Sequence, residues 1–156
     1  MTDTLVRLLT PRQLEAVLLH ELAHIVFADC EQVVAMKTFC AMLSDGSLAG
    51  SLLASTKQKL KILETGFELT ADRVMCHCMP EHWDEILSMF MMLAGGSVGE
   101  PLNAPAFLEQ LKQADLQVEN SIVIASVMKN PHPPIGFRIQ QLQSFRQSRA
   151  LVPHIL

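Results

Sequence analysis

One short stretch of the chain, AVLLHELAHIVF at residues 16–27, constrains the fold more than any other. Nine of its twelve residues are apolar, so a helix built from it would be hydrophobic around almost its whole circumference and is expected to lie inside the protein. Its polar residues are His20, Glu21 and His24. Burying three titratable groups is unfavourable unless each finds a partner, and a divalent metal ion would serve all of them. We therefore expect a metal site on this helix.

The spacing of the two histidines supports this expectation. His20 and His24 lie four residues apart, so on a helix they stack one turn above the other and can reach the same ion. The pattern is HExxH, in which Zn²⁺ binds both histidines and the intervening Glu21 acts as general base toward water. The alternative is a pair of core histidines that happen to lie one turn apart.

The composition favours a helical protein. A chain of 156 residues is expected to form one domain, residues 1–156, with its own core. Hydrophobic residues make up 49%, tyrosine is absent, and β-branched residues rarely alternate with polar ones. The predicted fold is mainly α, with the HExxH helix at its centre and little or no sheet. The net charge of −4, without a basic stripe, argues against a nucleic-acid partner.

No secretory signal or transmembrane segment is expected. Residues 1–9 contain charges and no continuous apolar core, and the longest uncharged run, 86–99, is too short to span a bilayer. We expect a soluble protein, with peripheral membrane contact through the apolar region 43–54 left open. The cysteines lie in apolar helical stretches, which indicates reduced core thiols: Cys30, Cys40, Cys76 and Cys78. The expected location is the cytoplasm or a reducing organelle compartment such as a stroma.

Capping signals and periodicity predict the helices. Thr10, Pro11 and Gln13 predict a helix that begins at Pro11 with a capping box. Ser55 is the expected N-cap of a long helix. The segment 4–9 is expected to be a terminal strand or a turn, and 48–54 a short helix or a turn. The further helices are expected at 31–43, 56–78, 81–93, 105–113, 121–128 and 135–149.

A third ligand must come from elsewhere in the chain, because catalytic zinc usually has three protein ligands. A histidine six residues after His24 would serve, but this position holds Cys30. Glu68 is the best candidate, because Asp72 follows it on the same helix face and can accept the outward N–H of a zinc-bound histidine. The alternative is that Glu68 and Asp72 face solvent beside Arg73.

Hydrolysis of a peptide also needs a donor to the oxyanion besides the metal. Many proteases use a tyrosine, and this chain has none. His132 stands between Pro131 and Pro133 on a stiff connector, which suits a preorganised donor. The alternative is a loop histidine near the start of the last helix.

Three motifs carry a resemblance to a known family. HELAH at 20–24, ELTADR at 68–73 and HPPIGFRIQQL at 132–142 resemble the HExxH, ExxAD and HPxxxxRIxxL motifs of the zinc metallopeptidase family that includes bacterial HtpX and the CAAX-prenyl endopeptidases. LAGG at 93–96 and LNAPAFLEQ at 102–110 resemble its soluble cyanobacterial and plastoglobular branch. The resemblance extends from about residue 5 to 145 and implies a helical, zincin-like core of the gluzincin type.

The resemblance also implies roles for individual residues. Glu21 would be the base and proton shuttle, and His132 would lie near the substrate. Arg138 would be a buried structural charge, paired with a carboxylate such as Asp72. One Zn²⁺ per chain would be bound by His20, His24 and Glu68.

The expected function is a zinc-dependent endopeptidase acting on peptides or unfolded proteins. Family members generally carry an upstream segment with an edge strand along which a substrate pairs. Only residues 1–19 precede the motif here, so most of that segment is expected to be absent. The alternative is therefore a metal-binding interaction domain that is inactive or needs a partner to complete its cleft. Further alternatives are a metal-free helical scaffold and a peptidase of phage-type repressors, although the HPxxxxR motif argues against the latter.

Overall fold

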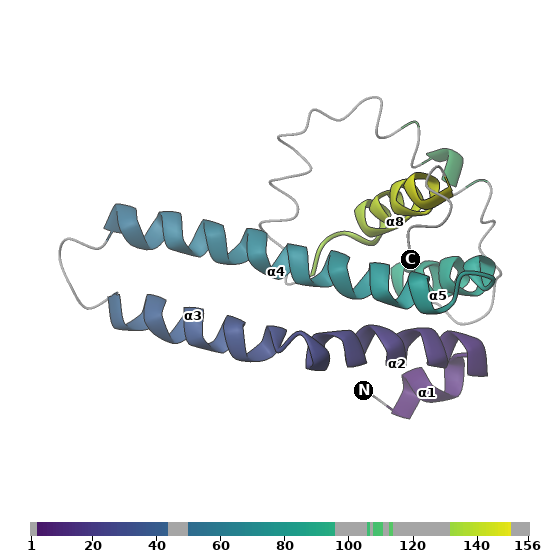
Figure 1. Cartoon of the computed structure of the whole chain (residues 1–156), viewed down its shortest axis with the longest axis horizontal. Helices are drawn as coiled ribbons and strands as arrows, with labels where there is room; N and C mark the ends of the chain where they lie inside the picture. The colour runs from purple at the N-terminus through teal and green to yellow at the C-terminus, as the bar shows by residue number, and fades with distance from the viewer. Residues whose placement is uncertain are drawn as a thin grey trace.

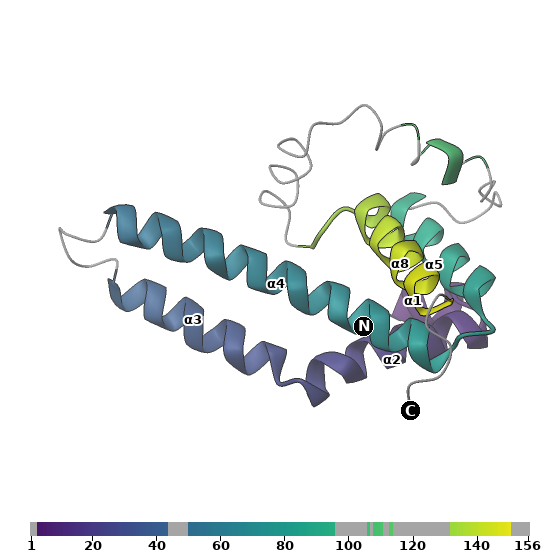
Figure 2. The same ribbon diagram turned by 45° about the horizontal axis from the view of Figure 1, so that its top comes forward.

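A computed structural model describes residues 3–43, 50–95, 106, 108–110, 113 and 132–150. Over these residues the chain is largely helical and contains no strand, which confirms the predicted mainly α fold. In Figures 1 and 2, α4 runs the length of the described structure, α2 and α3 lie beside it, and α5 and α8 pack at one end. The helices are α1 (Asp3–Leu8), α2 (Pro11–Val26), α3 (Asp29–Leu43), α4 (Gly50–Cys78), α5 (Trp83–Gly95) and α8 (Ile135–Ala150).

Helix α2 begins where the capping signals predict. The backbone N–H of Gln13 donates to Thr10 Oγ1 at 3.2 Å, and the backbone N–H of Thr10 donates to Gln13 Oε1 at 2.9 Å. Pro11 occupies the first helical position, where its missing N–H removes no hydrogen bond. Gln13 is buried and donates through Nε2 to Ser88 Oγ of α5 at 3.1 Å. This contact ties the start of the HExxH helix to α5.

The hydrophobic core lies where the second half of α4 meets α2, α5 and α8. Met89 and Met91 of α5 are each 3% exposed and fill part of this core. Each large apolar side chain buried here contributes roughly 1.5–3 kcal/mol, so this end is a firm support for the residues that face the interior. The largest fully buried apolar side chains are Phe90, Met75, Ile86, Ile139 and Leu142.

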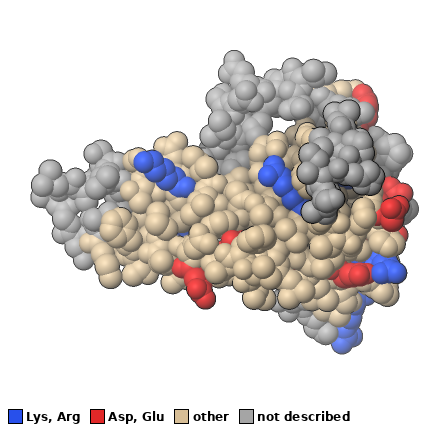
Figure 3. Space-filling model, viewed as in Figure 1, with Lys and Arg blue, Asp and Glu red and all other residues tan. Residues whose placement is uncertain are grey.

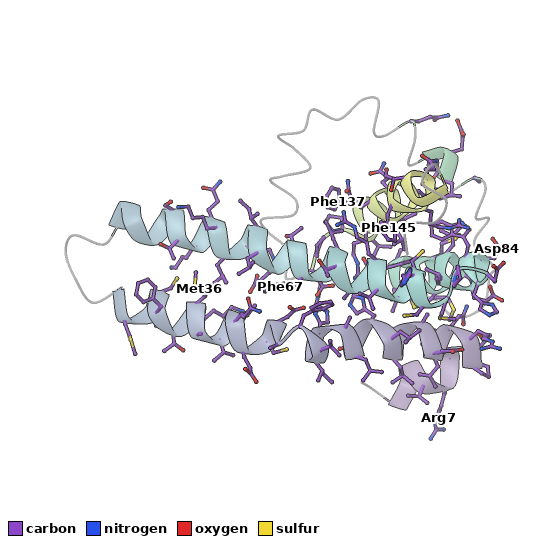
Figure 4. The ribbon with its side chains drawn as sticks, in the orientation of Figure 1. Arg7, Met36, Phe67, Asp84, Phe137 and Phe145 are labelled. Atoms are coloured by element: carbon purple, nitrogen blue, oxygen red, sulfur yellow. The ribbon has the colours of Figure 1, made fainter. Side chains whose placement is uncertain are left out.

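Helix α3 and the first half of α4 form a long hairpin that extends away from this core (Figure 2). Cys40 of α3 and Leu60 of α4 are buried, and Met36 and Phe67 lie between the two helices in Figure 4. Helix α4 begins at Gly50 rather than at 56, so Ser55 lies inside the helix and is not its N-cap. The leucines and alanine at 52–54 are good helix formers, which explains the earlier start.

Other boundaries differ less from expectation. Residues 3–8 form helix α1, whereas a strand or a turn was expected. The prediction failed because the periodicity of such a short apolar run does not distinguish a helix from a strand. Helices α3, α5 and α8 begin and end within two residues of the expected bounds. Of the helix expected at 105–113, residues 106, 108–110 and 113 are described and are helical. The helix expected at 121–128 lies outside the described residues.

Helix α2 is not buried around its whole circumference, and this expectation is wrong. Ala16, Val17 and Ala23 face the interior, but Ile25 and Val26 are 72% and 75% exposed. The helix packs against α4, α5 and α3, and this packing leaves part of its apolar surface exposed. The apolar residues of a segment indicate that it favours burial, but they do not show which faces of the helix will be covered by neighbouring helices.

The cysteines form no disulfide, but only Cys40 and Cys76 are buried. Cys30 and Cys78 are exposed, so the expectation of four core thiols is wrong for this pair. No described helix combines the length and hydrophobicity needed to cross a bilayer. On the face shown in Figure 3, basic and acidic side chains are scattered over a largely uncharged surface.

Candidate metal centre

The three residues predicted as metal ligands meet between α2 and α4. His20 Nε2 and His24 Nε2 lie 3.2 Å apart, and their rings are arranged edge to face with centroids 4.8 Å apart. Glu68 of α4 completes the group, with Oε2 3.6 Å from His20 Nε2 and Oε1 3.7 Å from His24 Nε2. The packing of α2 along α4 therefore brings together residues that are more than forty positions apart in sequence.

These separations fit a small coordination shell. A tetrahedral ion with bonds of about 2.1 Å to nitrogen and oxygen holds its ligand atoms about 3.4 Å apart. The observed 3.2, 3.6 and 3.7 Å lie close to this value. Glu68 Oε2 is buried and makes no hydrogen bond in the structure, and its ion pair with Arg138 Nη1 at 3.4 Å offsets only part of the cost of this arrangement. A cation between the three side chains would remove this cost.

A carboxylate lies behind each histidine. Asp29 Oδ2 is 2.8 Å from His24 Nδ1, and Asp72 Oδ1 is 3.0 Å from His20 Nδ1, although the latter contact lacks the alignment of a hydrogen bond. A carboxylate at Nδ1 favours the tautomer with its proton there and leaves the Nε2 lone pair for a metal. If both histidines adopt it, two lone pairs face each other at 3.2 Å, which is repulsive unless a cation or a proton lies between them.

Sequence reasoning missed Asp29. This residue is 3% exposed and begins α3 directly after Ala28, whose φ of 54° lies in the left-handed region. The bend at Ala28 turns the chain so that the Asp29 carboxylate returns to His24. An acidic residue shortly after the second histidine of HExxH was the available signal. It was obscured because an aspartate is also common in the first turn of a helix for its effect on the helix dipole.

The charges in the cluster shift two pKa values. Burial opposes a charge on His20, but Asp72 and Glu68 outweigh it and raise the pKa of His20 from 6.5 to about 9. Burial also opposes ionisation of Glu68, but His20, Arg138 and His132 lower its pKa from 4.5 to about 2. Without a metal ion, the cluster therefore holds a proton on His20 at neutral pH. A metal needs the neutral imidazole and would displace this proton.

Arg138 of α8 is a buried positive charge beside the cluster. Its Nε donates to Asp72 Oδ2 at 2.8 Å and its Nη2 to Asp72 Oδ1 at 2.6 Å, a two-point contact. Its Nη1 lies 3.4 Å from Glu68 Oε2, and its guanidinium lies 5.0 Å from the Phe90 ring centroid. Burial alone would lower the pKa of Arg138, but Asp72 and Glu68 raise it. The guanidinium thus holds two carboxylates of α4 in fixed positions.

His132 and Glu21 lie at the open side of the cluster. His132 Nδ1 is 2.9 Å from Glu68 Oε1, and the His132 side chain is 68% exposed. Its other ring nitrogen remains able to meet a ligand, while the buried Pro133 fixes the connector that carries it. Glu21 is exposed and lines the same pocket, so the expectation that its carboxylate is buried is wrong.

The pocket that contains the cluster has a volume of about 660 Å³. Beyond the cluster it is lined by Val17, Met89 and Leu93 at one end and extends along α3 and α4 to Lys37 and Glu64 at the other. This volume is within the range of about 300–1,000 Å³ that ligand pockets occupy. The arrangement offers a cation site, an exposed carboxylate beside it and room for part of a chain molecule.

Comparisons with known proteins agree with these features. The model of the family described as "Peptidase family M48" matches residues 1–146. A similar protein is "Plastoglobule-localized metallopeptidase 48, chloroplastic" from Arabidopsis thaliana, which is 33% identical over 156 residues. The matched region covers 95% of this chain and 40% of the relative, so the chain spans less than half of that protein's length. No solved structure matches the chain.

Proposed function

Because the chain belongs to peptidase family M48, we propose that it is a zinc-dependent endopeptidase acting on peptides or unfolded proteins. The observation that carries this proposal is the convergence of two imidazole nitrogens and a carboxylate at 3.2, 3.6 and 3.7 Å. One Zn²⁺ per chain would supply Lewis-acid activation of the scissile carbonyl and of water. It would be held by His20, His24 and Glu68.

Glu21 is proposed to move the protons. Its carboxylate is exposed within the pocket, one residue from the ligand His20, where it can take a proton from the attacking water and pass it to the leaving amine. His132, when its imidazole carries a proton on both ring nitrogens, would donate from Nε2 to the carbonyl oxygen as negative charge develops there. The contact between His132 Nδ1 and Glu68 sets the direction of that ring.

The surrounding carboxylates and Arg138 are proposed to position the ligands. Asp29 would hold the Nδ1 proton of His24 and so aim its Nε2 at the metal. Asp72, whose Oδ1 lies 3.0 Å from His20 Nδ1, would do the same for His20. Arg138 neutralises the charge of Asp72 and fixes it against α8.

A second candidate function is a metal-bound domain that cleaves only when a partner completes its cleft. The observation that favours it is the exposed apolar face of α2, which includes Leu22, Ile25 and Val26 and which no described residue covers.

The proposed location is a reducing compartment, either the cytoplasm or an organelle stroma. Peripheral membrane contact, which the sequence left open, stays part of this proposal, and the Arabidopsis relative is named as plastoglobule-localized.

Metal analysis and an assay with unfolded casein test the proposal. The full chain should bind about one zinc, and Glu68→Ala should lose it. Glu21→Gln should retain zinc but lose turnover, whereas Glu15→Gln, which alters another exposed glutamate of α2 outside the pocket, should change neither. Cleavage at the wild-type rate by Glu21→Gln refutes its role. Chelator-sensitive cleavage by the chain alone removes the second candidate, and zinc binding without cleavage favours it.

A further inference from the structure

The pocket continues beyond the metal cluster along the seam of the α3–α4 hairpin. Cys30, Val33 and Lys37 line its α3 side, at the helical spacing that places them on one face. Glu64 and Phe67 line its α4 side, and Phe67 lies between the two helices in Figure 4. A ligand that enters the cluster therefore has an adjoining channel with apolar walls and a charged end.

Lys37 and Glu64 are the charged residues that line this end of the pocket, and Lys61 lies beside Glu64 outside the lining. Lys37 Nζ lies 2.9 Å from Glu64 Oε1, and the two side chains are 61% and 21% exposed. Lys61 Nζ lies 3.5 Å from Glu64 Oε2, and the Lys61 side chain is only 12% exposed. Two ammonium groups thus flank one carboxylate. If the exposed Lys37 turned toward a ligand, Glu64 would keep the more buried Lys61 as its partner.

The other charges lining the pocket do not compete for this role. Arg138 is engaged by Asp72 and Glu68, and the remaining lining charges are acidic: Glu21, Asp29 and Glu68. Lys37 is therefore the pocket-lining cation whose side chain has the exposure to reorient. Because a lysine side chain on a helix leans toward the N-terminus, Lys37 leans back along α3 in the direction of the cluster.

The distance from this end to the cluster is set by α4. Glu64 and Glu68 are four residues apart on one helix face, so their side chains are separated by about 6 Å. An extended peptide advances about 3.3 Å per residue. A group that meets Lys37 while the peptide lies on the cluster is therefore two or three residues from the bond at the metal.

We propose that the α3–α4 end of the pocket binds a carboxylate of the substrate through Lys37. Substrates would then carry either an acidic side chain or their own C-terminal carboxylate two or three residues from the cleaved bond. This inference deepens the proposed peptidase function and rests on it, since the metal cluster marks where the bond lies. It adds a specificity-determining residue outside the ligand set.

Peptide binding to a non-cleaving chain tests this inference without relying on turnover. The full, zinc-loaded chain carrying Glu21→Gln would be titrated with pairs of fluorescent peptides. The two members of a pair differ only in carrying aspartate or asparagine two or three residues from the bond that lies at the metal. A second, shorter pair ends at that position, with the C-terminus either free or amidated. This pair shows whether Lys37 binds the C-terminal carboxylate of the peptide or an acidic side chain. We expect about twofold to fivefold tighter binding of the carboxylate form, since the contact is solvent-exposed, and a smaller ratio at high salt.

Lysine variants assign the effect. Lys37→Ala should abolish the preference and Lys37→Glu should invert it. Lys59→Glu is the matched control, because Lys59 is exposed on the same hairpin but does not line the pocket, and it should leave the ratio unchanged. A general effect of charge on the hairpin would appear in this control.

The outcomes separate the two proposals. Equal affinity for the acidic and neutral peptides, no binding of either, or a preference that survives Lys37→Glu overturns the inference. If the preference depends on Lys37 but the wild-type chain cleaves none of these peptides, the endopeptidase proposal fails and the carboxylate site stands. Circular dichroism of each variant confirms that it is folded before its affinities are compared.

Discussion

Raising the pH from 6.5 through about 9 should destabilise the metal-free protein. Burial disfavours the charge on His20, but Asp72 and Glu68 raise its pKa from 6.5 to about 9. A group whose pKa is higher in the folded chain contributes stability below its unfolded pKa and loses it as the pH rises through the folded value. At about 1.4 kcal/mol for each pH unit between the two values, the loss is about 3 kcal/mol.

The acid side of the profile has the opposite sign. His20, Arg138 and His132 overcome burial and lower the pKa of Glu68 from 4.5 to about 2. The stability from Glu68 is therefore fully present above pH 4.5 and is lost as the pH falls through about 2. Both shifts include the same contact between His20 and Glu68, so their energies are not added. For this cluster, the metal-free chain should be most stable between pH 4.5 and 6.5.

Urea unfolding of the chelator-treated chain measures this profile, with a parallel series in saturating zinc. Zinc takes the place of the His20 proton, so the loss between pH 6.5 and about 9 should disappear in the second series. His82→Gln is the control, because His82 pairs with Glu85 away from the cluster and its removal should leave the loss in place. Constant stability of the metal-free chain over this range, or an equal loss with zinc, would refute the reasoning.

Two substitutions test neighbouring features. Asp29→Asn should weaken zinc binding by about tenfold to a hundredfold in competition with a chromophoric chelator, while Glu31→Gln in the same first turn of α3 should not; equal affinities would show that Asp29 does not position His24. Gly66→Ala should raise the free energy of unfolding by about 0.5–1 kcal/mol, because Gly66 is inside α4 and an added Cβ meets nothing within 4 Å. A lower midpoint in urea would contradict that expectation.

Local signals predicted most of the fold. The start of α2 is correct because Thr10 and Gln13 form the capping box within four residues, and no distant contact is needed to specify it. The predictions of where α4 starts and of how deeply α2 is buried were wrong for a different reason. Whether residues 50–55 continue a helix, and which face of α2 finds a neighbour, depends on the packing of whole helices. Hydrophobic pattern in one segment carries no information about that packing.

The site divides in the same way. His20, His24, Glu68 and Asp72 were predicted as one group from spacing on two helices, and the structure places them together. Zinc itself and the roles of Glu21 and His132 stay predictions, since spacing defines which side chains can meet and not what they bind. Asp29 was missed because its position depends on the left-handed conformation of Ala28. Alanine rarely adopts this conformation, so the sequence does not predict it.

The remaining alternative to a metal is a hydrogen-bonded cluster held together by the proton on His20. A proton on Nε2 of His20 points in one direction and can satisfy one neighbour, either the other imidazole at 3.2 Å or the carboxylate at 3.6 Å. The carboxylate oxygen Glu68 Oε2 stays without a hydrogen bond in the structure. An ion at the centre binds the three ligand atoms at once. Both histidines then keep a proton on Nδ1, where Asp29 and Asp72 can accept it in a hydrogen bond. The proton is thus the weaker occupant, and its displacement makes zinc affinity rise with pH up to about 9.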